Sequence, residues 1–201
     1  RYFVRVKPAV LEAFGAELGL PPGEALESEF VACNTTALDA ALYDAANPRA
    51  FVLSQGRNLM ILKGVGFAED ILSYYELDDV EGQVWIGHQR YPTRGRVWHP
   101  GGAHPFSGLD EALVHNGDLA NYAAIVEYLG QKGIEPRFLT DTEVAVRLFD
   151  LYNRTYGYPL ECICEALAPT TERDFEMLPK DRQRVYRALR QSHLHGSPDG
   201  P

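Results

Sequence analysis

Near the middle of the chain stands the stretch that decides the fold, Gln83-Val-Trp-Ile-Gly-His-Gln-Arg-Tyr-Pro-Thr-Arg-Gly95. Its first residues are branched and aromatic, which favours a strand over residues 83–87. The strand delivers His88 and Arg90 at its end, and residues 92–108, rich in Pro and Gly, predict a loop after it. We therefore expect a guanidinium group at the edge of a sheet.

Turn signals and apolar periodicity divide the rest of the chain into short elements. A 3.6-residue period predicts helices over residues 9–18, 38–46, 68–75, 122–129, 140–152, 159–167 and 180–193. Alternating or branched residues predict strands over residues 2–7, 27–32, 112–115 and 137–139, and a β-hairpin over residues 50–63. This order predicts an α+β layered domain whose sheet is mostly antiparallel.

The composition is that of an ordinary globular protein, with 201 residues of which 45% are hydrophobic and 23% charged. A net charge of −9 argues against nucleic acid as a partner. No run of about 18 apolar residues is present, which argues against a membrane span. The three cysteines make no disulfide framework and predict a cytoplasmic protein. Cys162 and Cys164 are separated by one residue, which is typical of helix filling rather than of a redox or zinc pair.

Arg90 and Thr93 are candidates for binding a carboxylate. The planar fork of Arg matches a carboxylate with two parallel hydrogen bonds, and the Thr hydroxyl lies three residues further on. The alternative is an exposed Arg in an ordinary ion pair. Because Arg94 and Arg96 also lie here in an otherwise acidic chain, a small anionic group is favoured over a charged polymer.

The segment Gly102-Ala-His-Pro-Phe106 places His104 in a Gly-rich loop. There it could act as a catalytic base, bind a metal or hold the loop by hydrogen bonds. With His88, His99 and His115 it could be drawn into a zinc site, but the spacing lacks the patterns of zinc ligands and no Cys is nearby. We expect no metal and no cofactor, and we favour the structural role for His104.

Two further segments suit the two ends of one small ligand. Asn116 and Gly117 can offer a side-chain amide and a backbone N–H to the same oxygen, as in an oxyanion hole, although Asn-Gly is also an ordinary hairpin turn. In Thr140-Asp-Thr-Glu143 the carboxylate of Asp141 could face a ligand ammonium, or the segment could simply cap a helix. Together with Arg90 these groups suit glutamine, without excluding other zwitterions.

Four short motifs follow one another in the order typical of one enzyme family. They are His88-Gln-Arg-Tyr-Pro-Thr-Arg-Gly95, Ala103-His-Pro105, His115-Asn-Gly-Asp-Leu-Ala-Asn121 and Thr140-Asp-Thr-Glu143. In this order they resemble the class II glutamine amidotransferases. Over about residues 50–200 the chain is similar to the amidotransferase domains of the glutamate-synthase type, for example from Lys63 to Ile71.

The resemblance implies a four-layer α-β-β-α sandwich of the N-terminal-nucleophile hydrolase type, here incomplete at both ends. Residues 1–165 would be part of the type-2 amidotransferase domain, with residues 1–48 as a possible insertion. Residues 166–201 would be a truncated helical extension of the same domain. The roles carried over are the α-carboxylate site for Arg90 with Thr93, packing beside the substrate for Tyr91, the α-ammonium site for Asp141, and the oxyanion hole for Asn116 and Gly117.

In this family the nucleophile is an N-terminal Cys whose own α-amine activates the thiol, and glutamine is hydrolysed through a γ-glutamyl thioester. The ammonia then passes to a synthase partner. Here position 1 is Arg, and Cys33 lies deep in the chain before Asn-Thr-Thr. We expect the nucleophile to lie upstream of this chain, which alone should be inactive. The alternative is a regulatory module that binds glutamine or a related amino acid without hydrolysing it.

Overall fold

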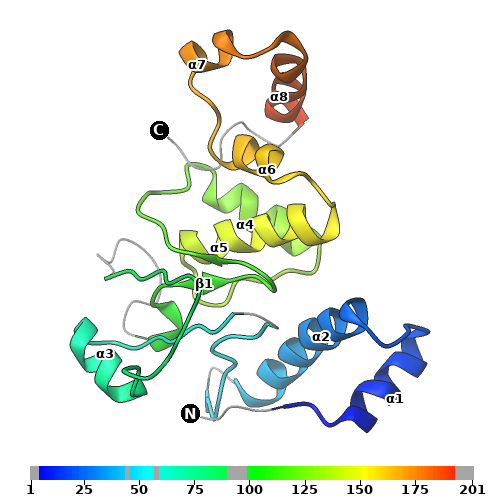
Figure 1. The fold of residues 1–201 in the computed structure, drawn as a ribbon, viewed down its shortest axis with the longest axis vertical. Coiled ribbons are helices and arrows are strands. Elements are labelled where there is room, and N and C mark those ends of the chain that lie inside the picture. Colours follow the sequence, from blue (N-terminus) through cyan, green and yellow to red (C-terminus); the bar gives the residue numbers. More distant parts are fainter. Residues whose placement is uncertain (1–4, 44–45, 57–58, 90–98, 193–201) are drawn as a thin grey trace. The chain divides into compact units, whose positions relative to one another are not determined.

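The computed structural model describes residues 5–43, 46–56, 59–89 and 99–192, which fall into two compact units, residues 1–61 and residues 62–201 (Figure 1). None of the helices in this described part is both long and apolar enough to cross a membrane.

The first unit is a pair of helices, α1 (Pro8–Leu18) and α2 (Glu24–Leu42). Pro8 stands at the first helical position, where its fixed φ suits the start of a helix. A Cβ built on Gly15 would lie 2.8 Å from a methyl carbon of Leu26, so this glycine allows the two helices to approach closely.

Helix α2 corrects two predictions, the strand over residues 27–32 and a separate helix starting at residue 38. The Phe30 and Val31 pair at residues 27–32 suits a strand, but the Glu, Ala and Leu residues around it favour a helix. The aromatic ring of Phe30 packs edge-on against Phe14 of α1, with centroids 5.2 Å apart. Tertiary packing between two helices therefore decides this segment.

The predicted β-hairpin over residues 50–63 has no regular strands in the described residues, which exclude residues 57–58. Two tertiary hydrogen bonds take the place of a ladder. The Ile61 N–H donates to the hydroxyl of Ser54 over 3.1 Å, and the Val52 N–H donates to the carboxylate of Asp39 over 2.7 Å.

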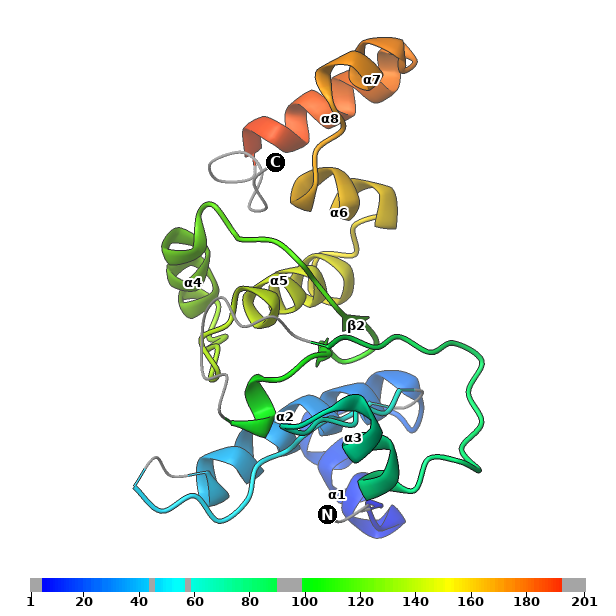
Figure 2. The same ribbon diagram turned by 90° about the vertical axis from the view of Figure 1, so that its left-hand side faces the viewer.

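The second unit is mainly helical. Its elements are α3 (Ala68–Tyr75), η1 (Pro100–Gly102), β1 (Phe106–Ser107), β2 (Ala112–Leu113), α4 (Tyr122–Gln131), α5 (Asp141–Asp150), η2 (Leu151–Thr155), α6 (Leu160–Leu167), α7 (Glu172–Met177) and α8 (Lys180–Ser192). Strands β1 and β2 pair antiparallel, and both views show the central helix α5 close to α4 and to this short hairpin (Figures 1 and 2).

Helix α5 lies at the centre of this unit and is buried on nearly every side. Val144, Val146 and Leu148 are fully or almost fully buried, as is typical of a helix enclosed by its neighbours. At its end, the Asp150 carboxylate accepts a hydrogen bond of 3.1 Å from the Leu109 N–H in the turn between β1 and β2. The hairpin is thereby held against α5.

The five helices predicted in this unit are confirmed, with ends that differ by a few residues, and α7 is an additional one. The predicted strands are fewer or shorter in the structure. Residues 83–87 form no strand, and Val84 is 82% exposed, because a strand needs a neighbour to pair with and none of the described residues supplies one. Residues 137–139 form none either, since Leu139 has φ 57°. The strand expected over residues 112–115 is limited to β2.

The four-layer sandwich stays a prediction, because the described residues pair in a single two-stranded sheet. Of the strand predicted over residues 2–7, the described residues 5–7 have no regular structure. Helices α7 and α8 lie within residues 166–201, the segment predicted to be a helical extension.

Candidate functional site

The candidate site lies at the N-terminus of α5, where four consecutive polar residues, Thr140 to Glu143, are buried. The hydroxyl of Thr140 accepts a 3.0 Å hydrogen bond from the Glu143 N–H, which confirms the predicted helix cap. The Glu143 carboxylate in turn accepts 2.8 Å hydrogen bonds from the N–H groups of Arg137 and Phe138. Both side chains of the capping motif therefore fix the chain as it enters the helix.

Asp141, the first residue of α5, is only 4% exposed. Its Oδ1 accepts a 2.8 Å hydrogen bond from the Thr142 N–H. Its Oδ2 is buried and receives no hydrogen bond from the residues that the structure describes, and the His115 Nδ1 lies 4.0 Å from it. A buried carboxylate oxygen without a donor is costly, so this atom is suited to accept a hydrogen bond from a ligand.

A chain of imidazole and amide contacts leads away from α5. The His104 Nε2 lies 2.8 Å from the hydroxyl of Thr142. The His104 ring packs against the ring of His88, with centroids 4.2 Å apart and planes tilted by 33°. The His88 Nε2 lies 2.6 Å from the Oδ1 of Asn116. These contacts connect the predicted oxyanion residue to the helix that carries Asp141.

The structure brings two of the predicted site segments together. Asn116 and Gly117 follow β2 and are exposed, and among the described residues they do not connect two paired strands as an ordinary hairpin turn would. His115, the residue before them, lies next to Asp141. The predicted carboxylate-binding residues, Arg90 and Thr93, and the predicted packing residue Tyr91 lie outside the described residues, so their roles stay predictions.

The prediction that His104 holds its loop by hydrogen bonding agrees with its contact to Thr142. No group of three or more His, Cys, Asp or Glu residues within the described part of the chain could hold a metal ion.

Lys63 is a site residue that sequence reasoning missed. It is 6% exposed, its Nζ donates a 3.0 Å hydrogen bond to the Gly101 carbonyl, and the same nitrogen lies 4.0 Å from the centre of the Phe106 ring. Burial lowers the pKa of Lys63 to about 7, a shift that the nearby Glu143 carboxylate opposes and Arg147 reinforces. Its place directly after the apolar run 59–62 was the one available signal.

The segment that Lys63 holds passes close to the entry of α5. A side chain on Gly101 would collide with the ring of Phe138, so only glycine fits there. The His99 ring stacks on the same Phe138 ring, with centroids 5.4 Å apart. Residues 99–106 are therefore anchored between Lys63 and the residues that precede the helix.

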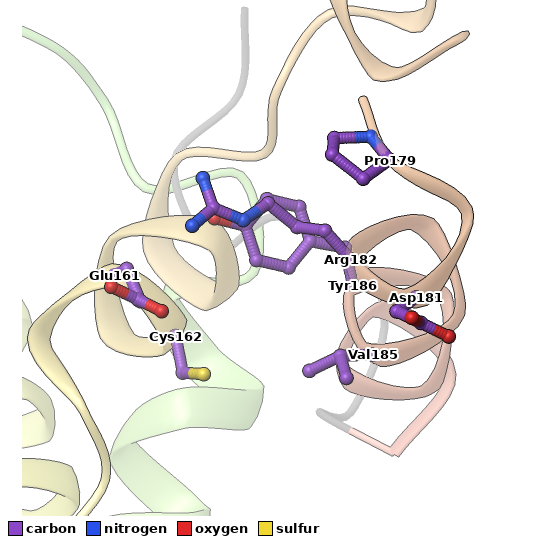
Figure 3. Close-up of a pocket in the computed structure, with 7 residues that line it drawn as sticks. All are labelled: Glu161, Cys162, Pro179, Asp181, Arg182, Val185 and Tyr186. Atoms are coloured by element: carbon purple, nitrogen blue, oxygen red, sulfur yellow. The ribbon is translucent and has the colours of Figure 1, made fainter. Parts of the chain in front are cut away.

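Two of the three cysteines, Cys33 and Cys162, are in surroundings that do not favour a nucleophile. Cys33 lies inside α2, and burial and the neighbouring Glu29 raise the pKa of its thiol. Cys162 lies in α6 beside a pocket between α6 and α8 (Figure 3), and burial and Glu161 raise the pKa of that thiol too. A raised pKa keeps a thiol protonated, and the protonated form is a poor nucleophile.

Comparison with known proteins gives relatives that include named glutamine-dependent enzymes and an amidotransferase-like protein. The chain is 35% identical over 142 residues to the glutamine amidotransferase-like protein GlxB of Rhizobium meliloti, which covers 68% of this chain and 47% of that protein. It is 35% identical over 118 residues to the glutamine–fructose-6-phosphate aminotransferase of Campylobacter jejuni, covering 57% of this chain and 19% of that enzyme. The chain is related to the glutamine amidotransferases.

Among the relatives of this amidotransferase-related chain is an uncharacterized protein of Archaeoglobus fulgidus, 38% identical over 145 residues, or 72% of this chain and 38% of that protein. The chain thus spans less than half the length of each of these relatives. No family model matches the chain, and no solved structure matches it.

Proposed function

We propose that this chain is the glutamine-binding part of a class II amidotransferase domain. Asp141 binds the α-ammonium group of glutamine, and Asn116 and Gly117 form the oxyanion hole at its γ-carbonyl oxygen. Arg90 with Thr93 binds the α-carboxylate, and Tyr91 packs beside the substrate. The observation that carries the proposal is the buried Oδ2 of Asp141, which receives no hydrogen bond from the described residues although it lies beside the His115–Gly117 segment.

An ammonium group fits this oxygen for a physical reason. A buried carboxylate is stabilised by a cation that also donates hydrogen bonds to it, and a primary ammonium does both. An anionic group would be repelled by the Asp141 carboxylate and by the net charge of −9 on the chain. The amide of Asn116 and the N–H of Gly117 supply donors of the kind that a carbonyl oxygen needs as it becomes negative.

The reaction we infer is the hydrolysis of glutamine to glutamate and ammonia through a thioester. A cysteine thiolate attacks the γ-amide carbon, and the oxygen becomes an oxyanion held by the two donors. The C–N bond then breaks, the leaving nitrogen takes a proton and departs as ammonia, and water hydrolyses the thioester. The ammonia passes to an acceptor domain or subunit, for which a glutamate-synthase-like partner is our proposal.

The attacking cysteine in this proposal is supplied from outside these 201 residues. Cys33 lies in the middle of α2, and Cys162 and Cys164 lie in α6, so none of them has a free α-amine beside its thiol. The fold we propose for the whole domain is the four-layer sandwich of N-terminal-nucleophile hydrolases.

The same α-ammonium site at Asp141 also suits a second candidate function, a module that senses glutamine or a related amino acid without hydrolysing it. Both functions need the α-ammonium site at Asp141, and only the enzyme needs a nucleophile. Assaying the full-length protein for release of glutamate and ammonia separates them. Turnover supports the enzyme, and tight glutamine binding without turnover supports the sensor.

The binding site itself is tested by calorimetric titration of the chain with L-glutamine. Asp141→Asn keeps the oxygen that accepts from Thr142 and removes the negative charge, and we expect glutamine to bind it at least about tenfold more weakly. Asp181→Asn on α8 is the matched control, because that carboxylate is 93% exposed. Equal glutamine affinity of Asp141→Asn and the unaltered chain would refute the ammonium site.

A further inference from the structure

His88 and Asn116 are 28 positions apart in the sequence and share a short hydrogen bond of 2.6 Å between Nε2 and Oδ1. An amide oxygen can only accept a hydrogen bond, so the proton lies on the His88 Nε2 and the imidazole donates. This contact distinguishes the two faces of the Asn116 side-chain amide. The oxygen is turned toward His88, and the NH₂ group is turned away from it.

The His88 ring is itself held in place. It packs against the His104 ring at 4.2 Å, and the His104 Nε2 contacts the Thr142 hydroxyl at 2.8 Å. The hydroxyl of Thr142 donates to the Oδ1 of Asp141 over 3.4 Å. The orientation of the Asn116 amide is therefore set by side chains that reach back to the start of α5.

We propose that His88 is a positioning residue which, through its hydrogen bond to Oδ1, directs the Asn116 NH₂ group toward the γ-carbonyl oxygen of glutamine. The inference rests on the proposed function, because it requires Asn116 to be a donor in the oxyanion hole. An asparagine amide has two orientations related by a 180° turn of its side-chain torsion, and only one presents the NH₂ group. In the other orientation the amide oxygen would face the substrate oxygen, and the two would repel each other.

This role makes a prediction that a purely structural role does not. Removing the imidazole should weaken the contact with the substrate carbonyl and leave contacts with the amino-acid end unchanged. The two contributions are separated by comparing L-glutamine with L-norvaline, which has the same α-amino acid end and the same number of side-chain carbons but no side-chain carbonyl.

The experiment is calorimetric titration of the 201-residue chain with both amino acids. We expect His88→Ala to lower the affinity for glutamine about fivefold while the affinity for norvaline stays unchanged. His88→Gln retains an N–H donor and is expected to recover most of the loss. Asn116→Ala should produce the same loss, and adding His88→Ala to it should cause no further change, because both substitutions remove one interaction.

The variants distinguish failure of the positioning role of His88 from failure of the proposed glutamine site. An equal loss of affinity for both amino acids in His88→Ala, no loss at all, or additive losses in the double variant would overturn the positioning role. Asp141→Asn tests the proposed function separately, because it should weaken both amino acids. If Asp141→Asn changes neither affinity, the proposed function fails. If it weakens both and Asn116→Ala lowers the glutamine preference while His88→Ala does not, the inference alone fails.

Discussion

Replacing the buried Lys63 by Met should make the stability of the protein less dependent on pH. Met is unbranched and about as long as the lysine stem, so it can fill the same space against the Phe106 ring without carrying an amine. The hydrogen bond to the Gly101 carbonyl is lost, which costs about 1 kcal/mol at every pH. The pH-dependent part of the change is therefore the informative one.

The size of the pH-dependent change in the free energy of unfolding follows from the burial of Lys63. Lys63 has an ordinary pKa of 10.5, and burial lowers it to about 7 in the folded chain. Between these values the unfolded chain binds the proton more tightly, so the free energy of unfolding rises with pH. Above pH 10.5 the amine is neutral in both the folded and the unfolded chain, and the folded chain carries no penalty for a buried charge. As the pH falls from 10.5 toward 7, the free energy of unfolding decreases, because the unfolded chain takes up the proton and the folded chain does not. Relative to Lys63→Met, the unaltered chain should gain about 2 kcal/mol between pH 7 and pH 9.

The measurement is urea unfolding of both chains at pH 7 and at pH 9, with the difference between them taken at each pH. Taking the difference cancels the titration of all other groups. Lys7→Met is the matched control, because Lys7 lies exposed just before α1 and its removal should give the same difference at both pH values. A difference for Lys63→Met that does not change with pH would refute the claim that its ammonium form is penalised by burial.

Two further substitutions test how the helices are held. Thr140→Ala removes the hydroxyl that accepts a hydrogen bond from the Glu143 N–H, and it should lower the free energy of unfolding by about 1–2 kcal/mol. Thr140→Ser keeps the hydroxyl and should lower it clearly less. Equal losses of the two variants in urea unfolding would argue against the cap. Arg190→Met leaves the buried Glu165 carboxylate without its 2.8 Å cationic partner and should cost about 3 kcal/mol. Arg184→Met is its control, since that ion pair with Asp181 is exposed on both sides and should give no measurable change; equal effects of the two Arg substitutions would contradict the importance of burial.

The helices of the second unit were predictable because their signals are local. Apolar spacing marks α4 and α6, and the Thr140 cap was evident from the residue types and the spacing of its motif. Residues 83–87 show the limit of such signals. Their composition suits a strand, but a strand also needs a partner, and local composition says nothing about whether one is near.

The contacts of the candidate site depend on long-range packing. Asn116 and Asp141 were recognisable from their motifs, and the structure adds that His115 places the first close to the second. The pairing of His88 with Asn116 joins residues 28 positions apart, and that of Lys63 with Gly101 joins residues 38 positions apart. His88 was only part of a motif in the sequence, and the fold identifies its partner.

Asp141 differs from its buried neighbours at the start of α5 in how its side chain is satisfied. Thr140, Thr142 and Glu143 are as buried as Asp141, and each has its polar group satisfied by a nearby N–H or imidazole. The buried polar side chains of these three residues are therefore satisfied within the described part of the chain. The Oδ2 of Asp141 alone among these side chains receives none from the described residues. Such an oxygen destabilises the unliganded chain, and under the proposed function its hydrogen-bond donor is the α-ammonium group of glutamine.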